Sequence, residues 1–203
     1  MKRAVLASAN PGKLRELTAL LAPLSLQLVP QGELGIETPP ETGATFLENA
    51  LLKARHAAGC ARLPALADDS GLEVAALGGR PGVHSARFAG EGASDARNLL
   101  RLLAELQGVP PGARQACYQC VIVWVRDAAD PSPLIARGSW RGHIAAAPRG
   151  DGGFGYDPLF VPEGAECTAA QLPAAAKNAV SHRGQALRAL VAVLGSSGYI
   201  RAS

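Results

Sequence analysis

Apolar residues occur along the chain as short continuous runs and as stripes at helical spacing, and the two patterns alternate. The runs predict short buried strands at residues 3–9, 24–29 and 63–67. The stripes predict two helices between these strands, marked by Leu14, Leu17, Leu20 and Leu21 and by Leu47, Ala50, Leu51, Ala54 and Ala58. Thr45 and Glu48 have the spacing of a capping box at the start of the second helix.

The second half of the chain predicts a helix, a hairpin and a final helix. Ser94 is expected to cap a helix that runs through Leu106, and its apolar stripe is a core face or an interface face. Residues 116–126 and 134–142 read as two antiparallel strands that form a projecting arm or a second lobe. The last helix follows Ser181 and carries a stripe of Leu187, Leu190, Val191 and Leu194. We therefore expect an α/β fold over residues 1–203, a single domain with a mixed twisted sheet flanked by helices and two lobes with a central cleft.

Composition narrows the class of protein. The 203 residues are 48% hydrophobic and 18% charged, with 23 Gly and 15 Pro, which is typical of a globular chain with many turns. The net charge of +3 comes from basic and acidic residues that are mixed along the chain, so a nucleic-acid partner is not expected. No apolar stretch is long enough to span a membrane. The polar segment at residues 10–13 interrupts the N-terminal apolar run before a signal-peptide core is complete.

The four cysteines do not predict a metal site. Only Cys117 and Cys120 have metal-like spacing, and in a strand residues three apart point to opposite faces. Thiols in a reducing cytoplasm are the better interpretation, and we expect a cytoplasmic protein.

The least ordinary stretch is Asp68-Asp69-Ser70-Gly71, where the apolar run 63–67 ends in two carboxylates. At the carboxyl end of a strand, where open α/β sheets bind ligands, adjacent acids are easiest to explain if a divalent cation shares their charge. The alternative is an ordinary turn, since Asp, Ser and Gly are turn formers.

Cations stand at two predicted helix starts, where they oppose the helix dipole. Lys13 lies in the first turn of the first helix, and with Ser8, Asn10 and free backbone N–H groups it could bind a phosphate. The alternative is a solvated surface lysine. His182 and Arg183 stand at the start of the last helix in the same way.

Two further residues near the second helix have open roles. Lys53 shares a polar helix face with Asn49 and His56, and is either solvated or a second cation of the site. Glu41 is either a loop carboxylate or a metal ligand.

A glycine-dense loop at 150–158 carries Phe154 and Tyr156, two of only nine aromatic residues in the chain. Exposed rings on such a loop are explained if they meet a nucleobase. They could instead fold back as loop anchors.

These motifs resemble, in order and over nearly the whole chain, those of the inosine triphosphate pyrophosphatase family. The resemblance rests on the motifs at residues 8–13, 41–43, 46–50, 53–55, 67–72, 81–87 and 153–158, on Lys177 and on residues 181–184. It implies hydrolysis of ITP, dITP and XTP to the monophosphate and pyrophosphate, with Mg²⁺ and usually by a homodimer.

The resemblance also implies roles for individual residues. Ser8, Asn10, Lys13 and Lys53 would bind the triphosphate, with Lys13 and Lys53 offsetting charge on the leaving pyrophosphate, and Ser70 would contact substrate as well. Asp69 would accept a proton from the attacking water, and Glu41, Asp68 and Asp69 would surround the metal. Phe154, Gly155, Tyr156 and Asp157 would hold the base, and Lys177, Ser181, His182 and Arg183 would contact base or phosphate.

Two other functions fit parts of the pattern. A related septum-inhibition type nucleotide pyrophosphatase would have a similar site but act on modified pyrimidines. A nucleotide-binding regulator would bind the same ligand without turnover, although the Asp68-Asp69 pair argues against it. Candidate dimer surfaces are the stripe of the Ser94 helix and the hairpin arm.

Overall fold

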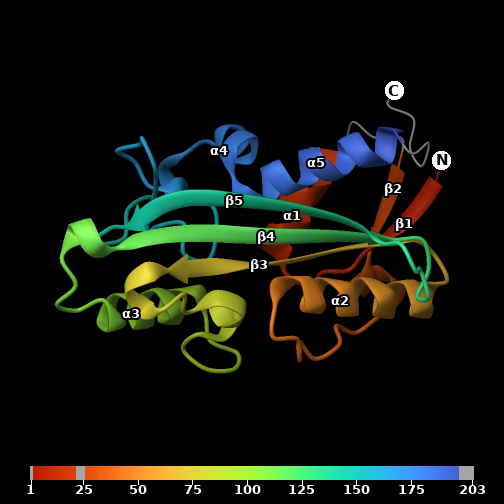
Figure 1. Cartoon of the computed structure of the whole chain (residues 1–203), viewed down its shortest axis with the longest axis horizontal. Coiled ribbons are helices and arrows are strands. Elements are labelled where there is room, and N and C mark those ends of the chain that lie inside the picture. The colour runs from red at the N-terminus through yellow and green to blue at the C-terminus, as the bar shows by residue number, and fades with distance from the viewer. Residues whose placement is uncertain (1, 22–25, 197–203) are drawn as a thin grey trace. The chain divides into compact units, whose positions relative to one another are not determined.

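The computed structural model describes residues 2–21 and 26–196, and their strands form one mixed sheet (Figure 1). The hydrogen-bonded order is β2-β1-β3-β4-β5-β6. The strands are β1 (Lys2–Leu6), β2 (Leu26–Pro30), β3 (Ala65–Val74), β4 (Gln115–Val125), β5 (Leu134–Ile144) and β6 (Phe160–Pro162). Strand β1 pairs in parallel with β2 and β3, and β5 pairs antiparallel with β6. The α/β fold with a mixed sheet is therefore confirmed, while residues 24 and 25 of the predicted second strand lie outside the described residues.

The predicted hairpin corresponds to β4 and β5. The eight residues between them reach at most about 29 Å, and each strand of 11 residues is about 36 Å long. Because so short a connection cannot return to the start of a parallel strand, the pair is antiparallel. The chain divides into two compact units, and β4 and β5 both contribute residues to each. The hairpin, which was predicted to be a projecting arm or a second lobe, is therefore shared between the two units.

The first unit contains the chain up to Asp69, Cys120–Gly138 and the residues from Arg183 onward. Helices α1 (Pro11–Leu21) and α5 (His182–Ser196) pack on one face of its strands, where Leu17, Leu66, Ile122 and Leu187 share a core cluster. Helix α2 (Phe46–Ala61) covers the other face. Its buried residues there are small, namely Ala50, Ala54, Ala57 and Ala58. Small side chains allow the helix to approach the sheet closely.

The second unit contains Ser70–Gln119 and Ser139–His182. Its core joins Leu102 and Leu106, from and just beyond α3 (Asp95–Glu105), to Tyr118, Trp140 and Phe160 of the sheet. The leucine stripe of the Ser94 helix is therefore a core face, which is one of the two roles predicted for it. The unit also contains α4 (Ala174–Val180), which the sequence did not predict.

Local signals located the helix starts well. Thr45 and Glu48 form the capping box of α2, and the Ser94 side chain accepts a hydrogen bond from the Arg97 N–H at the start of α3. Short 3-10 helices fill the connections, as η1 (Gln31–Leu34), η2 (Ala75–Leu77), η3 (Gly82–Arg87), η4 (Pro111–Ala113) and η5 (Ala169–Gln171).

Strand β3 differs from its prediction because it does not end before the carboxylates. It runs without interruption from Ala65 to Val74, so Ser70 and Gly71 form no turn, and Gly71 has no positive φ. Leu72 and Val74 are fully buried in the second core. Their burial extends the strand through residues whose local preference is for a turn, which is a tertiary override of propensity.

Within the described ranges, none of the helices combines the length and apolar character that crossing a lipid bilayer requires.

Gly142 in β5 allows the neighbouring strand β6 to lie close to β5. A Cβ atom at this position would lie 2.2 Å from the Val161 carbonyl oxygen and 2.8 Å from the Phe160 ring, so one strand would have to move. We expect Gly142→Ala to lower the free energy of unfolding by about 1–3 kcal/mol in denaturant titrations. Gly112→Ala is the matched control, because nothing lies within 4 Å of its added Cβ, and it should change stability little. Equal stabilities of the two variants would contradict this packing.

Candidate active site

Asp68 lies in the middle of β3 and is bound by two cations from different helices. Its Oδ2 atom accepts from Arg183 Nε at 3.3 Å and Arg183 Nη2 at 3.2 Å, and Lys13 Nζ lies 3.1 Å away. Arg183 also donates through Nη1 to Glu16 of α1. Asp68 and Arg183 are each only 1% exposed. The contacts therefore form a buried charge cluster, the Asp68 cluster, of Asp68, Lys13, Arg183 and Glu16.

Opposite charge decides the ionisation of Asp68. Burial by itself raises the pKa of a carboxyl group, but the Lys13 and Arg183 cations outweigh it and hold the pKa of Asp68 well below its ordinary value. The same contacts raise the pKa of the Arg183 guanidinium despite its burial. Asp68 is thus a permanent anion at neutral pH.

Asp69 has a different set of partners, all in the first unit. Lys53 Nζ lies 2.8 Å from Asp69 Oδ1 and 2.8 Å from Glu41 Oε1, and so bridges the two carboxylates. The Asn49 amide donates to Asp69 Oδ2 at 3.3 Å. The predicted polar face of α2 is divided, because Asn49 and Lys53 are buried in this Asp69 cluster while His56 is exposed.

Asp69 and Asp68 differ in pKa as well as in partners. Burial raises the pKa of Asp69, the nearby Glu41 raises it further, and Lys53 and Lys13 only partly offset these effects, so its pKa lies above the ordinary value. A carboxylate with a raised pKa is a stronger proton acceptor near neutral pH. Of the two acids, Asp69 is thus the better candidate for a general base.

The two carboxylates do not form the adjacent pair that the sequence suggested. Because β3 continues through them, successive side chains point to opposite faces of the sheet. Asp68 accordingly meets α1 and α5, and Asp69 meets α2. The prediction that they stand together at the end of a strand is wrong, because β3 continues to Val74 and each carboxylate has its own cation.

The predicted metal ligands Glu41, Asp68 and Asp69 do not all lie on one face of β3. Among the described residues no three His, Cys, Asp or Glu side chains are grouped as a metal site. Mg²⁺ in phosphate-transfer sites is commonly held by one or two carboxylates together with substrate phosphates and waters, not by a complete protein cage. The carboxylates of Glu41 and Asp69, which share Lys53, suit that ion, so the donor chemistry on this face of β3 fits Mg²⁺.

The predicted phosphate loop is folded on itself at the start of α1. The Asn10 side-chain oxygen accepts from the N–H groups of Gly12 at 2.9 Å and Lys13 at 3.1 Å, and Ser8 Oγ accepts from the Asn10 N–H at 3.2 Å. Two of the N–H groups predicted to be free therefore bind Asn10. A phosphate could take them only if the Asn10 side chain turned away.

The aromatic loop in the second unit forms a separate polar group. Asp157 accepts from the Phe154 N–H at 2.9 Å and is ion-paired with Lys177, and both Asp157 and Lys177 are buried. The Lys177 ammonium also lies 4.9 Å from the centroid of the Phe154 ring, which is a cation–π distance. Phe154 itself is only partly buried and remains accessible.

Tyr156 takes the role of a loop anchor, the alternative reading of the aromatic pair. It is 3% exposed, and its hydroxyl donates to the Ser85 carbonyl at 2.9 Å. Ser85 Oγ in turn accepts from the Leu72 N–H and donates to the Gly82 carbonyl. Tyr156 therefore fixes the loop to the core, and Phe154 is the ring that a base can reach.

Sequence reasoning missed three residues that complete these groups. Tyr118 stacks on the His182 ring at 4.6 Å with a 3° interplanar angle, and its hydroxyl donates to Asp157 at 3.3 Å. Strand alternation marks Tyr118 only as a core residue. Glu16 and Asn49 were polar positions on predicted helices, and only the tertiary structure shows that they face charged partners.

The predicted site residues thus fall into groups with distinct contacts. Lys13, Asp68 and Arg183 meet in one, Glu41, Lys53 and Asp69 in another, and Phe154, Asp157 and Lys177 in a third. Gly155 binds Asp95 through its N–H at 2.7 Å. Ser70 lies within β3, and Ser181 directly precedes α5.

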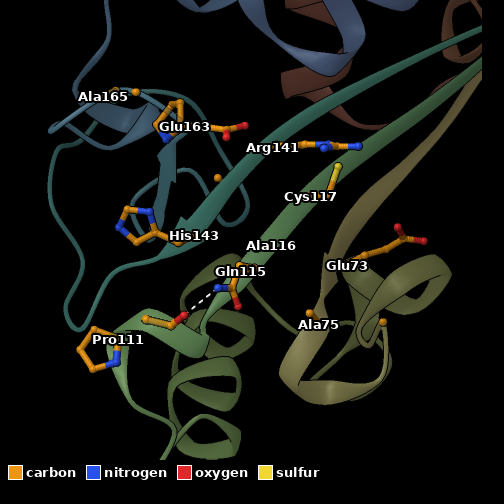
Figure 2. A pocket seen from close by; sticks show the side chains of 15 residues that line it. Glu73, Ala75, Pro111, Gln115, Ala116, Cys117, Arg141, His143, Glu163 and Ala165 are labelled. Atoms are coloured by element: carbon orange, nitrogen blue, oxygen red, sulfur yellow. Dashed lines mark hydrogen bonds between the residues drawn. The ribbon is translucent and has the colours of Figure 1, made fainter.

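A pocket of about 890 Å³ in the second unit is large enough for a small molecule but contains none of the predicted site residues. Figure 2 shows Glu73, Cys117 and Arg141 on its walls, from β3, β4 and β5. Glu73 is bound to the Gln119 amide at 2.9 Å. Buried charges and perturbed pKa values mark catalytic sites better than volume does, so the clusters above remain the candidate site.

Comparison with known proteins gives consistent matches over nearly the whole chain. The model of the Ham1 family matches residues 4–193. A dITP/XTP pyrophosphatase from Photorhabdus laumondii is 55% identical over 194 residues, which are 96% of this chain and 98% of that protein. One from Methylococcus capsulatus is 58% identical over 193 residues, 95% of this chain and 96% of that protein. A solved structure of a HAM1 protein from Coxiella burnetii has a TM-score of 0.89 at 49% identity, covering 97% of this chain and 100% of that chain.

The Asp68 cluster should contribute strongly to stability. Arg183→Met leaves a buried carboxylate without its principal hydrogen-bond donor, and we expect the free energy of unfolding at pH 7 to fall by about 3–5 kcal/mol. Arg15→Met, at an exposed position of α1, is the control and should have little effect.

The difference in the free energy of unfolding between wild type and Arg183→Met should depend on pH. A carboxylate with a lowered pKa stabilises the fold fully above its ordinary pKa of 3.8 and loses that contribution as pH falls. The gap between wild type and Arg183→Met should therefore narrow below about pH 4 in denaturant titrations. A gap that stays constant down to pH 2 would contradict the assignment.

Proposed function

The chain belongs to the Ham1 family, and on that premise we propose that it hydrolyses purine nucleoside triphosphates with deaminated bases. Its substrates are ITP, dITP and XTP, and its products are the nucleoside monophosphate and pyrophosphate. The proposal rests on one observation, the position of the Lys53 ammonium between the carboxylates of Asp69 and Glu41. A proton acceptor with a raised pKa, Asp69, thus lies beside a cation that can bind phosphate. Such an activity removes damaged purines from the cytoplasmic nucleotide pool.

Asp69 is the proposed general base. It accepts a proton from a water molecule as the water oxygen attacks the α-phosphorus. The bond from the α-phosphorus to the bridging oxygen breaks, and pyrophosphate leaves with that oxygen. Lys13 and Lys53 offset the charge that develops on pyrophosphate, which is the main catalytic requirement of phosphoryl transfer.

The proposed metal is Mg²⁺, with Glu41 and Asp69 as candidate ligands on one face of β3 and Asp68 as a further candidate carboxylate on the other face. When bound, it would neutralise phosphate charge and lower the pKa of a bound water. Ser8 and Asn10, at the start of α1, would add contacts to the triphosphate once Asn10 releases the N–H groups that it now caps.

The base is proposed to stack on the partly buried ring of Phe154, which lies beside the Lys177 ammonium. Lys177 or backbone N–H groups would suit the 6-keto oxygen of hypoxanthine and xanthine, whereas the Arg183 guanidinium is buried and already donates to Asp68 and Glu16. An adenine would present its 6-amino group to those donors and leave one of them unpaired, which can discriminate strongly between substrates. His182, held in place by the stacked Tyr118 ring, and Ser181 complete the proposed contacts.

We also propose a homodimer, as the family resemblance implies. With the leucine stripe of α3 buried in its own core, the β4–β5 hairpin is the remaining candidate surface.

The substrate class is tested by measuring pyrophosphate release from ITP, XTP, dUTP and the four standard triphosphates, with and without Mg²⁺. We expect ITP and XTP to be hydrolysed at least about 100-fold more efficiently than ATP, and activity to require the metal. Preference for a pyrimidine would favour the rival pyrophosphatase, and metal-independent release would remove Mg²⁺ from the proposal.

The role of Asp69 is tested by Asp69→Asn, which keeps the shape of the side chain but cannot accept the proton. We expect kcat to fall by about 10²–10⁴-fold while ITP still binds, as measured by calorimetry. Asp127→Asn, at an exposed position in the hairpin loop, is the control and should retain wild-type kcat. Wild-type turnover by Asp69→Asn would disprove the assignment.

A further inference from the structure

Asp95 connects the start of α3 to the aromatic loop. Its carboxylate accepts a hydrogen bond of 2.7 Å from the backbone N–H of Gly155, which lies 60 residues further along the chain. The N-cap of α3 is the preceding residue, Ser94, which binds the Arg97 N–H. Asp95 is therefore not needed as the cap, and its hydrogen bond goes outside its own helix.

The hydrogen bond between Asp95 and Gly155 fixes the backbone directly after Phe154, and so it constrains the Phe154 ring. Gly155 directly follows Phe154 and has a φ of 62°, so its N–H direction is set by a left-handed conformation that favours glycine. On either side of it, Asp157 holds the Phe154 N–H and Ser85 holds the Tyr156 hydroxyl. Asp95 thus supplies the third fixed point of a short segment.

The helix start that carries Asp95 is held by further hydrogen bonds. Asn98, one turn after Asp95, is 2% exposed, and its side-chain amide accepts from the Ala89 N–H and donates to the Ala86 carbonyl. These bonds join α3 to the segment that follows Ser85, and Ser85 in turn binds Tyr156. The start of α3 and the loop are therefore parts of one hydrogen-bonded unit.

We propose that Asp95 is a positioning residue for base binding, which fixes Gly155 and thereby holds the Phe154 ring in the orientation that a purine stacks on. This inference rests on the proposed function, because it takes Phe154 as the base-binding ring. Asp95 itself does not touch the substrate. Its effect is on affinity for the base, not on the attack at phosphorus.

A purely structural role for Asp95 is the main alternative. An acidic residue in the first turn stabilises a helix through its dipole, whatever else it binds. Ser94→Ala weakens the same helix end without touching Gly155, and so it measures that contribution alone. Asp95→Asn keeps an oxygen that can accept the Gly155 N–H, whereas Asp95→Ala does not.

The test measures kcat and KM for XTP, and the dissociation constants of inosine monophosphate and pyrophosphate, on wild type, Asp95→Ala, Asp95→Asn and Ser94→Ala. For Asp95→Ala we expect KM and the dissociation constant of the monophosphate to rise about 3- to 10-fold, the value of one lost hydrogen bond. Its kcat should stay within about 2-fold, and pyrophosphate binding should be unchanged because pyrophosphate has no base. Asp95→Asn should recover most of the loss, and Ser94→Ala should resemble wild type.

Three results would overturn the inference. They are equal effects of Asp95→Ala and Ser94→Ala on KM, weakened binding of pyrophosphate along with the monophosphate, and an Asp95→Asn variant as impaired as Asp95→Ala. Failure of the proposed function is distinct, since wild type would then release no pyrophosphate from XTP.

Discussion

Two neighbouring carboxylates buried in the central part of β3 constrain the rest of the structure. Asp68 is 1% exposed and Asp69 is 5% exposed, and a buried charge is tolerated only when it is paired and hydrogen-bonded. Because the strand points them to opposite faces, they need cations from both sides of the sheet. Lys13 of α1 and Arg183 of α5 supply one side, and Lys53 of α2 supplies the other. The helices that complete the fold of the first unit are therefore the helices that carry the charges of the candidate site.

This arrangement explains how the site can be stable without substrate and still respond to it. In the described structure Lys13 and Lys53 neutralise carboxylates, so no large excess of charge is buried. Under the proposed function, the triphosphate competes for the same two lysines. The carboxylates that lose those partners then have negative charge available for a divalent cation, so binding of phosphate and metal would support each other.

Much of the fold followed from local sequence signals, and most of the errors came from tertiary contacts. The capping residues Thr45 and Ser94 located their helices because a cap is decided by a few neighbouring residues. The path of β3 through Ser70 and Gly71 could not be predicted, since it depends on the burial of Leu72 and Val74 in a core assembled from distant segments. The candidate residues were found by their chemical type. Their partners Glu16, Asn49 and Tyr118 were not, because no local pattern indicates which charge a helix or strand residue will face.

The glycines of the aromatic loop illustrate the same limit and change how the base site is understood. Read locally, Gly153 and Gly155 indicate a mobile segment. In the structure, a Cβ atom on Gly153 would lie 2.0 Å from the Asp157 carboxylate, and both glycines have a positive φ. Gly153 is required because Asp157 packs against its backbone while it binds Lys177 and the Phe154 N–H, whereas Gly155 is favoured by its left-handed φ alone. Glycine here permits close packing, so the loop is held in place by its own hydrogen bonds. A ring fixed in this way loses little conformational freedom when a base stacks on it, and that favours affinity.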